Sequence, residues 1–294
     1  MQPRLGSAAF ALAAASVLLA GCALKDPMVL KSDAHLTPAA KGQRDLAGLP
    51  PPKGKIVVAV YGFRDQTGQY KPAPESSFST TVTQGAAALL IKALKDSGWF
   101  TPVEREGLQN VLTERRIIRA IEHPQDKGNP AIQLPPLMPA QVLVEGGIVA
   151  YESNVRTGGL GVKYLGIGAS EQYRVDQVTV SLRVVDIRSG QIMNSVSTTK
   201  TIFSQQVQAG IFRFVAFKKL LEGEAGYTSN EPAQLAVKEA IEAGIMHLIA
   251  QGVRDRQWFL ADEKDLSSPV LQEYIRESGE LLNVSLENTV APWR

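Results

Sequence analysis

The spacing of apolar residues changes several times along the chain, and each change predicts a new element of secondary structure. Short β-branched runs, and runs that alternate apolar with polar residues, predict strands. Such runs lie at residues 56–61, 142–150, 178–184 and 192–196. Ser189 and Gly190 predict a tight turn between the last two strands.

Three other segments repeat apolar residues at spacings of three and four, which predicts amphipathic helices. They lie at about residues 79–98, 108–121 and 231–252. Ser79 is the expected N-cap of the first helix, and Gly98 its expected stop. Pro232 falls in the first turn of the third helix, where proline is tolerated, and Gly252 is expected to end it.

These elements divide the chain into a domain with two flanking segments. Strands on one side of helices predict an α+β domain over residues 54–261. Residues 22–53 are polar and proline-containing, so we expect a tether that is extended or wraps a neighbour. Residues 262–294 are charged and only weakly amphipathic, so we expect a peripheral helix or a mobile tail.

Residues 153–175 and 197–227 do not have the pattern of a protein core. Both are rich in small residues and alternate apolar with polar positions. In the second segment, Val207, Ala209 and Ile211 alternate with Gln206, Gln208 and Gly210. Each segment is long enough for a turn and two strands of about 9–11 residues, the strand length that crosses a membrane. We therefore predict two hairpins that can enter a membrane.

Aromatic residues gather in the same region, as in the interfacial girdles of membrane barrels. They are Tyr151, Tyr164, Tyr173, Phe203, Phe212, Phe214, Phe217 and Tyr227. The pattern alone equally allows a soluble domain with two long, glycine-rich hairpins. Four strands cannot close a barrel, and a bilayer does not tolerate open strand edges. Membrane insertion would therefore require several copies in one ring.

The first 21 residues have the pattern of a bacterial secretory signal. Residues 8–20 form an apolar run behind Arg4 that is too short to span a bilayer as a mature helix. Leu-Ala-Gly-Cys at residues 19–22 matches the lipobox of lipoproteins, which are cleaved before an acylated cysteine, here Cys22. An ordinary signal peptide with a chance cysteine is the alternative. Ala23, not Asp, stands directly after Cys22, so we expect anchoring in outer-membrane lipids and a periplasmic domain.

The composition argues against several kinds of chemistry. The whole chain has 31 basic and 29 acidic side chains, a balance that does not favour a nucleic-acid partner. His35, His123 and His247 are far apart and lack metal-ligand spacing. No nucleophile–base pair or phosphate-binding loop stands out. We therefore expect no enzymatic activity, no cofactor and no metal.

Several unusual blocks between about residues 50 and 255 resemble the CsgG family, the curli secretion channel lipoproteins. The blocks lie at residues 61–72, 78–80, 93–97, 107–110, 151–155, 221–224 and 226–232. Residues 65–72 read Asp-Gln-Thr-Gly-Gln-Tyr-Lys-Pro, and residues 226–232 read Gly-Tyr-Thr-Ser-Asn-Glu-Pro. The tether and the C-terminal tail are not covered by this resemblance.

The resemblance implies a nonameric outer-membrane channel. Each subunit would give two hairpins to a barrel of about 36 strands, the largest strand count known for such barrels. The resemblance also implies export of unfolded curli subunits without a nucleotide. The implied partners are a periplasmic capping protein, CsgE, and an extracellular protein, CsgF.

In the family, the loop between the first strand and the first helix narrows the pore; here it is about residues 69–78. Aligning Lys-Pro at 71–72 and Phe-Ser at 78–79 places the family's tyrosine, asparagine and phenylalanine positions on Ala73, Ser77 and Phe78. Only the phenylalanine is retained. The resemblance therefore implies a gate made mainly by Phe78 and leaves the pore width open. Phe78 could instead anchor the loop under the following helix.

The competing interpretation is a soluble lipoprotein adaptor that activates a periplasmic partner without forming a pore. Such an adaptor shares the α+β domain, so the fold does not separate the two functions. The two hairpin segments favour the pore, because an adaptor has no need of alternating, aromatic-flanked insertions.

Overall fold

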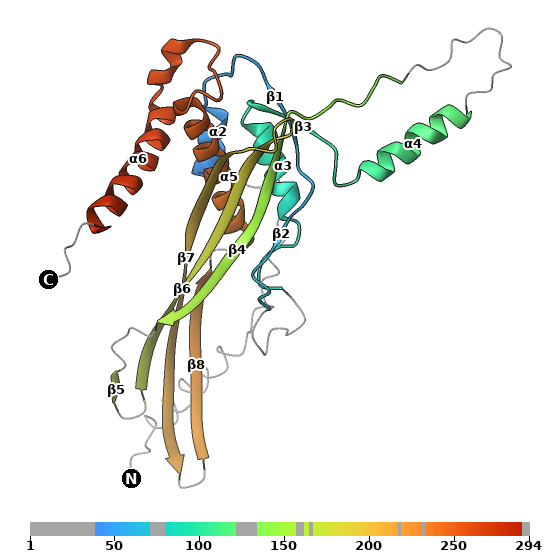
Figure 1. Cartoon of the computed structure of the whole chain (residues 1–294). Coiled ribbons are helices and arrows are strands. Elements are labelled where there is room, and N and C mark those ends of the chain that lie inside the picture. Colours follow the sequence, from blue (N-terminus) through green and yellow to red (C-terminus); the bar gives the residue numbers. More distant parts are fainter. Residues whose placement is uncertain are drawn as a thin grey trace, which may run out of the picture. The chain divides into compact units, whose positions relative to one another are not determined.

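A computed structural model gives the fold of the chain (Figure 1). It describes residues 39–70, 80–121, 134–156, 162–164, 167–216, 219–230 and 233–289. The predicted signal peptide, residues 1–21, and the predicted lipidation site, Cys22, lie outside the described residues.

One mixed sheet organises the fold. Its strands are β1 (Ile56–Ala59), β2 (Phe63–Asp65), β3 (Phe100–Val103), β4 (Val142–Arg156), β5 (Val162–Tyr164), β6 (Ile167–Asp186), β7 (Ile192–Ala216) and β8 (Lys219–Asn230). They follow the order β3-β1-β4-β6-β7-β8, with β2 paired to β4 and β5 to β6. The pairs that involve β1 and β2 are parallel, and those from β4 to β8 are antiparallel. All four predicted runs contain strands, although the first ends at Ala59 and not at residue 61.

The helices confirm the α+β class. They are α2 (Lys41–Ala47), α3 (Ala86–Asp96), α4 (Leu108–Ile121), α5 (Ala233–Arg254), the short 3-10 helix η1 (Glu263–Ser267) and α6 (Pro269–Thr289). Helix α5 contacts β6 and β7 of the sheet and also helices α2, α3 and α6. Apolar residues occur all around α5, as expected for a helix surrounded by other elements.

The core forms where α5 lies on the sheet. Ile241 and Ile245 of α5 and Leu182 of β6 are almost completely buried. Gly244 permits the close approach, because a Cβ atom there would come within 2.6 Å of the Leu182 Cδ1 atom. Thr198 of β7 adds a polar tie by donating a hydrogen bond to the carbonyl oxygen of Ala240 at 2.7 Å.

The predicted start of the first long helix is wrong. Helix α3 begins at Ala86, and Ser79 lies outside the described residues. The preceding residues are held in another way, since Thr80 forms a β-bridge with Tyr70 and the Thr81 amide donates to the Gln69 carbonyl oxygen. Because the backbone of Thr80 and Thr81 pairs with the chain before the loop, these residues are not helical and the helix starts later. The predicted stop is confirmed: the helix ends at Asp96, and Gly98 has a φ of 71°.

The predicted end of the last core helix is also wrong, by two residues. Helix α5 passes Gly252 and ends at Arg254. Gly252 is needed for packing instead, because a Cβ atom there would overlap the ring of Trp258. The chain turns at Arg256, which has a φ of 56°, and the amides of Gln257 and Trp258 both donate to the Gly252 carbonyl oxygen. Pro232 lies outside the described residues.

Part of the predicted tether, residues 22–53, is packed on the domain. Residues 41–47 form helix α2, and Leu46 is completely buried, so of the two predicted alternatives this part packs on its neighbour and is not extended. Further on, Pro52 forms a β-bridge with Leu260. The sequence pattern missed α2 because its single core residue lacks any helical periodicity.

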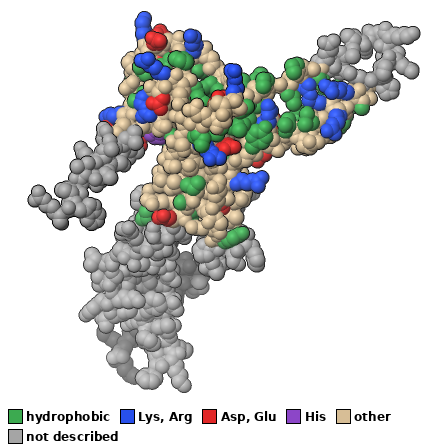
Figure 2. All heavy atoms as spheres, viewed as in Figure 1, with side chains coloured by type: hydrophobic (Ala, Val, Ile, Leu, Met, Phe, Trp, Pro, Cys, Tyr) green, Lys and Arg blue, Asp and Glu red, His purple; other side chains and the backbone are tan. Residues whose placement is uncertain are grey.

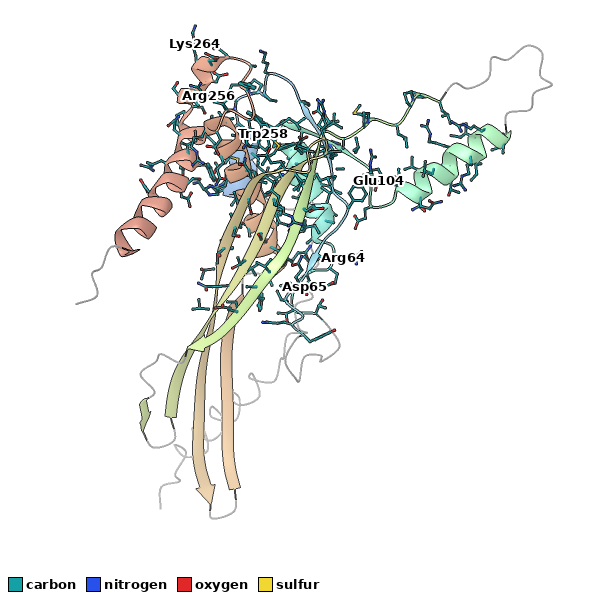
Figure 3. The ribbon with its side chains drawn as sticks, viewed as in Figure 1. Arg64, Asp65, Glu104, Arg256, Trp258 and Lys264 are labelled. Atoms are coloured by element: carbon teal, nitrogen blue, oxygen red, sulfur yellow. The ribbon has the colours of Figure 1, made fainter. Side chains whose placement is uncertain are left out.

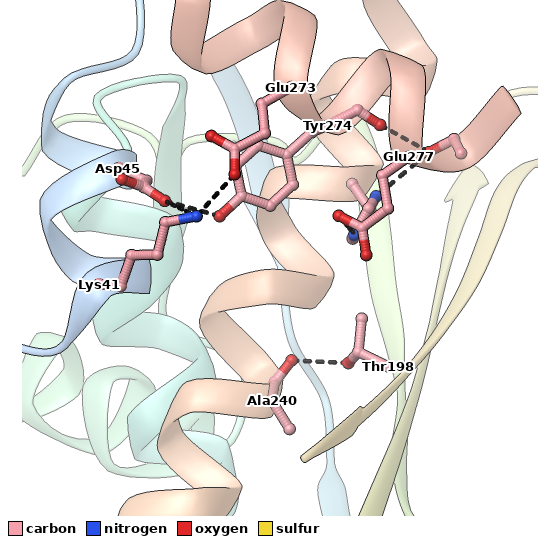
Figure 4. A network of polar contacts seen from close by, with 9 residues as sticks. Lys41, Asp45, Thr198, Ala240, Glu273, Tyr274 and Glu277 are labelled. Atoms are coloured by element: carbon pink, nitrogen blue, oxygen red, sulfur yellow. Dashed lines mark hydrogen bonds and ion pairs between the residues drawn. The ribbon is translucent and has the colours of Figure 1, made fainter. Parts of the chain in front are cut away.

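The predicted tail, residues 262–294, contains a helix that is tied to the domain. Tyr274 of α6 is buried and donates a hydrogen bond to the Asp45 carboxylate of α2 at 2.8 Å (Figure 4). Burial and this carboxylate raise the pKa of Tyr274. Lys41 forms an ion pair with Glu273 at 2.7 Å, and His247 of α5 packs edge-on against the Tyr274 ring. Helix α6 therefore joins α2 to α5.

Helix α4 has the predicted boundaries, but none of its residues is buried. Figure 2 shows hydrophobic and basic side chains side by side over this helix. Ile117 is 42% exposed. The guanidinium of Arg115 donates to the Pro135 carbonyl oxygen, so residues 134–140 run beside the helix. The apolar stripe of α4 thus stays outside the core of this chain.

Candidate functional site

The two predicted hairpin regions are antiparallel strand pairs that continue the central sheet. In the first region, 153–175, the end of β4 pairs with the start of β6, from Ser153 opposite Asp176 to Arg156 opposite Tyr173. In the second, 197–227, β7 pairs with β8 from Ser204 opposite Asn230 to Ala216 opposite Lys219. Strand β6 has 20 residues and β7 has 25, so both strands extend from the core directly into the hairpins.

In the middle of the hairpins, most residues lie opposite residues of like polarity. Across β6 and β7, Ile167 lies opposite Ile211 and Ala169 opposite Ala209. The alternate positions pair Ser170 with Gln208 and Gln172 with Gln206. Strand β8 continues the pattern, with Ala225 opposite Ala209. The pattern is broken by Glu171 opposite Val207, Phe212 opposite Glu222 and Arg213 opposite Leu221. Residues directly opposite one another share a face of the sheet. The alternation predicted along single strands therefore lines up across strands.

A polar junction lies on β4 and β6 at the base of the first hairpin. The register shifts between Ile148 and Ala150, which marks a β-bulge at Val149. Two residues later, the buried Tyr151 hydroxyl donates to the buried Asp176 carboxylate at 2.8 Å. A hydrogen bond to a charged group is worth about 1.5–3 kcal/mol, so this pair fixes the two strands at the junction.

The ends of the predicted constriction loop meet next to the same strand. Tyr70 and Thr80 form an antiparallel β-bridge, and the Thr81 amide donates to the Gln69 carbonyl oxygen at 3.0 Å. The loop between them contains the three predicted constriction residues, Ala73, Ser77 and Phe78, which lie outside the described residues. We call residues 63–70 together with 80–84 the loop root.

Two consecutive glycines in β4 allow the neighbouring strands, including the loop root, to pack closely against it. Strand β2 pairs in parallel with β4, with Arg64 opposite Gly147. A Cβ atom on Gly147 would come within 2.6 Å of the Arg64 carbonyl oxygen, so a larger residue would push β2 away. Gly146 has a φ of 153°, and a Cβ there would overlap the Ser181 backbone of β6. The glycine pair in a strand run signals such close approach, a clue that the sequence interpretation did not use.

The described part of the chain holds little other site chemistry. It contains no group of three or more His, Cys, Asp and Glu residues that could hold a metal ion. None of its helices has the length and hydropathy required of a membrane-spanning segment. His247 contacts Ser278 and Glu277 of α6 at 3.2 and 3.5 Å, as a packing residue would. Burial lowers the pKa of His247.

The fold and these sites define an α+β protein whose sheet extends into two long hairpins beside an anchored loop. Comparison with known proteins then gives the family. Residues 39–278 match the family model described as "Curli production assembly/transport component CsgG". The chain belongs to the CsgG family, which confirms the resemblance.

Two relatives have about half of their residues identical to this chain. The curli production assembly/transport component CsgG of Escherichia coli (strain K12) is 49% identical over 267 residues, or 90% of this chain and 95% of the relative. The protein of the same description from Salmonella typhimurium is 50% identical over 264 residues, or 88% of this chain and 94% of the relative.

Proposed function

We propose that this chain is the subunit of an outer-membrane channel that secretes unfolded curli subunits by diffusion, without a nucleotide. Its membership of a family of curli transport components supports a role in curli secretion. The observation that carries the channel itself is the register in the middle of the hairpins, where Ile167 and Ala169 lie opposite Ile211 and Ala209 and the alternate positions pair polar residues. A strand with one apolar and one polar face suits a barrel wall between lipid and water.

The same geometry requires several copies. Within the described residues, the outer strands of the hairpin region are β8 on one side and β4, with the short β5 beyond its end, on the other. Each side leaves backbone groups open at one edge. Open edges are not tolerated in lipid, so β8 of one copy would pair with β4 of the next until a ring closes. A nonamer, with four strands from each copy, is the number that the family resemblance suggests.

The location and the partners complete the proposal. Removal of residues 1–21 would leave Cys22 acylated and anchored in outer-membrane lipids, with the α+β domain in the periplasm. CsgE would cap the channel on the periplasmic side, and CsgF would act outside the cell. In the pore, Phe78 would form the main constriction, with Ala73 and Ser77 replacing larger side chains of the family pattern.

A matched pair of lysine substitutions tests the channel against the adaptor. Ile211 and Gln208 are three residues apart on β7, so they lie on opposite faces of the strand. On the proposed function, Ile211→Lys faces lipid and costs about 2–4 kcal/mol per subunit near the middle of the membrane, whereas Gln208→Lys faces the lumen and costs much less.

The measurement combines heat-resistant oligomer on a gel with planar-bilayer recording of the purified protein. We expect the wild type and Gln208→Lys to form the oligomer and conduct, and Ile211→Lys to lose most of it. Equal tolerance of both substitutions, together with no conductance from the wild type, would favour the soluble adaptor.

A further inference from the structure

A single carboxylate contacts the chain on both sides of the 71–79 loop. On the side before the loop, the Asp65 Oδ1 atom accepts hydrogen bonds from the Thr67 amide at 2.8 Å and from the Thr67 hydroxyl at 2.7 Å. The Thr67 hydroxyl oxygen in turn accepts from the Gln69 amide at 3.2 Å. Asp65 therefore fixes the chain up to the residue that precedes the bridge position Tyr70.

The other oxygen of the same carboxylate reaches the side after the loop. The Gln84 side-chain amide donates to Asp65 Oδ2 at 3.2 Å. The Thr80 hydroxyl donates to the Val82 carbonyl oxygen at 3.0 Å, which makes the returning chain compact. Gln84 also stands two residues before α3, whose inner face is in the core. The returning end of the loop is thus held between Asp65 and a buried helix.

Strand β4 gives Asp65 a firm position. Asp65 lies opposite Ile148, and the next amide, that of Gln66, donates to the Ile148 carbonyl oxygen at 2.9 Å. Figure 3 shows Arg64 and Asp65 together on β2. Ile148 itself is completely buried. The carboxylate is therefore attached to the core strand that continues into the first hairpin.

We propose that Asp65 is a positioning residue that holds both ends of the 71–79 loop in register with β4 and thereby sets the aperture of the channel. The effect on the aperture rests on the proposed function; the effect on the loop ends does not. In a ring of copies, a loop end that moved away from β4 would widen the constriction and make its width differ from copy to copy. A carboxylate suits this role because its two oxygens accept several hydrogen bonds at once.

Three variants test whether Asp65 holds both loop ends or only stabilises its own turn. Asp65→Ala removes every contact of the carboxylate. Asp65→Asn keeps an oxygen for Thr67, and its amide can donate to Gln84 once the Gln84 side chain turns over, so this variant is expected to restore most of the function.

Asp186→Ala is the matched control. Asp186 accepts the same kinds of hydrogen bonds, from the Ser189 hydroxyl and from the amides of Arg188 and Ser189. It does so in the turn between β6 and β7, which is not part of the loop root and does not pair with it.

Hydrogen exchange of the full-length protein gives the first measurement. The informative amide is that of Thr81, because its bond to the Gln69 carbonyl oxygen involves no atom of Asp65. We expect Asp65→Ala to speed exchange at Thr81, Asp65→Asn to remain close to wild type, and Asp186→Ala to leave Thr81 unchanged. The Ile56 amide, which donates to the Trp99 carbonyl oxygen in the core, should stay protected in all variants and so report intact folding. Unchanged exchange at Thr81 in Asp65→Ala would overturn the proposal.

Planar-bilayer recording gives the second measurement. We expect Asp65→Ala channels to show higher conductance and larger current fluctuations than wild type and Asp186→Ala channels. Faster exchange at Thr81 with unchanged current would refute the link to the aperture. A wild-type protein that conducts nothing would refute the proposed channel instead, and the exchange result would still decide whether Asp65 holds the loop ends.

Discussion

Replacing Lys238 by methionine should destabilise the protein strongly, because it removes the cationic partner of the buried Glu242. The two side chains stand one turn apart on α5, and their Nζ and Oε1 atoms are 2.7 Å apart. They are only 8% and 4% exposed. Lys238 also donates to the Gln43 side chain of α2 at 3.2 Å, whereas Glu242 Oε2 has no hydrogen-bond partner among the described residues.

The expected loss of stability follows from two opposing free energies, the attraction between the two charges and the cost of removing them from water. At 2.7 Å the attraction is about 6 kcal/mol for an effective dielectric constant of about 20. Removing both ions from water costs several kcal/mol for each, so the intact pair contributes little net stability. Lys238→Met loses the attraction and keeps the buried carboxylate, which typically costs about 3–5 kcal/mol. Adding Glu242→Gln to that variant should recover much of the loss, because no charge is then buried.

The pH dependence provides a second check on the same reasoning. Burial raises the pKa of Glu242 above 4.5, and Lys238 opposes that shift. Without Lys238 the folded-state pKa rises further. A raised folded-state pKa contributes stability that is complete below the unfolded value and is lost as the pH rises through the folded value. The deficit of Lys238→Met should therefore be largest at neutral pH and shrink as the pH falls toward 4.5.

Urea unfolding, followed through the buried Trp99 and Trp258, measures these differences without adding salt. Lys92→Met is the matched control, because Lys92 and Asp96 form an ion pair of the same spacing on α3 with side chains that are 55% and 28% exposed. Lys92→Met should lower the free energy of unfolding by no more than about 0.5 kcal/mol. Lys238→Met losing no more than Lys92→Met, or a double variant as unstable as the single one, would refute the account of the buried charge.

Three further predictions concern other parts of the chain. Gly252→Ala should lower stability by about 1–3 kcal/mol because Trp258 must move, whereas Gly279→Ala, which faces open space, should not; urea unfolding compares them. Burial lowers the pKa of His247, so its contribution to stability is present above pH 6.5 and is lost as the pH falls; His247→Gln should flatten this loss in melting temperatures measured from pH 7.5 to 5. Phe78→Ala should raise single-channel conductance with the oligomer intact, and unchanged conductance would make Phe78 a packing residue.

Local pattern predicted the elements of this fold better than their ends. The strand run at 178–184 and the turn at Gly190 follow from alternation and from a φ of 71° that suits glycine. The starts and stops depended on distant residues. Thr80 and Thr81 pair with the chain before the loop, so the helix expected from Ser79 begins at Ala86. Gly252 serves the Trp258 ring rather than the helix end. Neither contact can be read from neighbours in the sequence.

In the candidate site, too, local pattern predicted the elements but not the contacts between distant residues. Alternation along β7 predicted the second hairpin, but only the register shows that Ala209 meets Ala169 on one side and Ala225 on the other. The pattern Asp65-Gln66-Thr67 has the composition of a side-chain-stabilised turn and could have been recognised as one. The contact from Asp65 to Gln84 could not, because it depends on the chain closing a loop between them.

The position of the loop root on β4 has a mechanical consequence for the proposed channel. Strand β4 carries β2 at Gly147 and, a few residues later, enters the first hairpin. Closing a barrel would fix the tilt of β4, and the fixed strand would then hold the ends of every loop at one distance from the axis. Residues within the loop could vary without disturbing that frame. On the proposed function, Ala73 and Ser77 would alter the width of the constriction, whereas Gly146, Gly147 and Asp65 would keep the constriction in place.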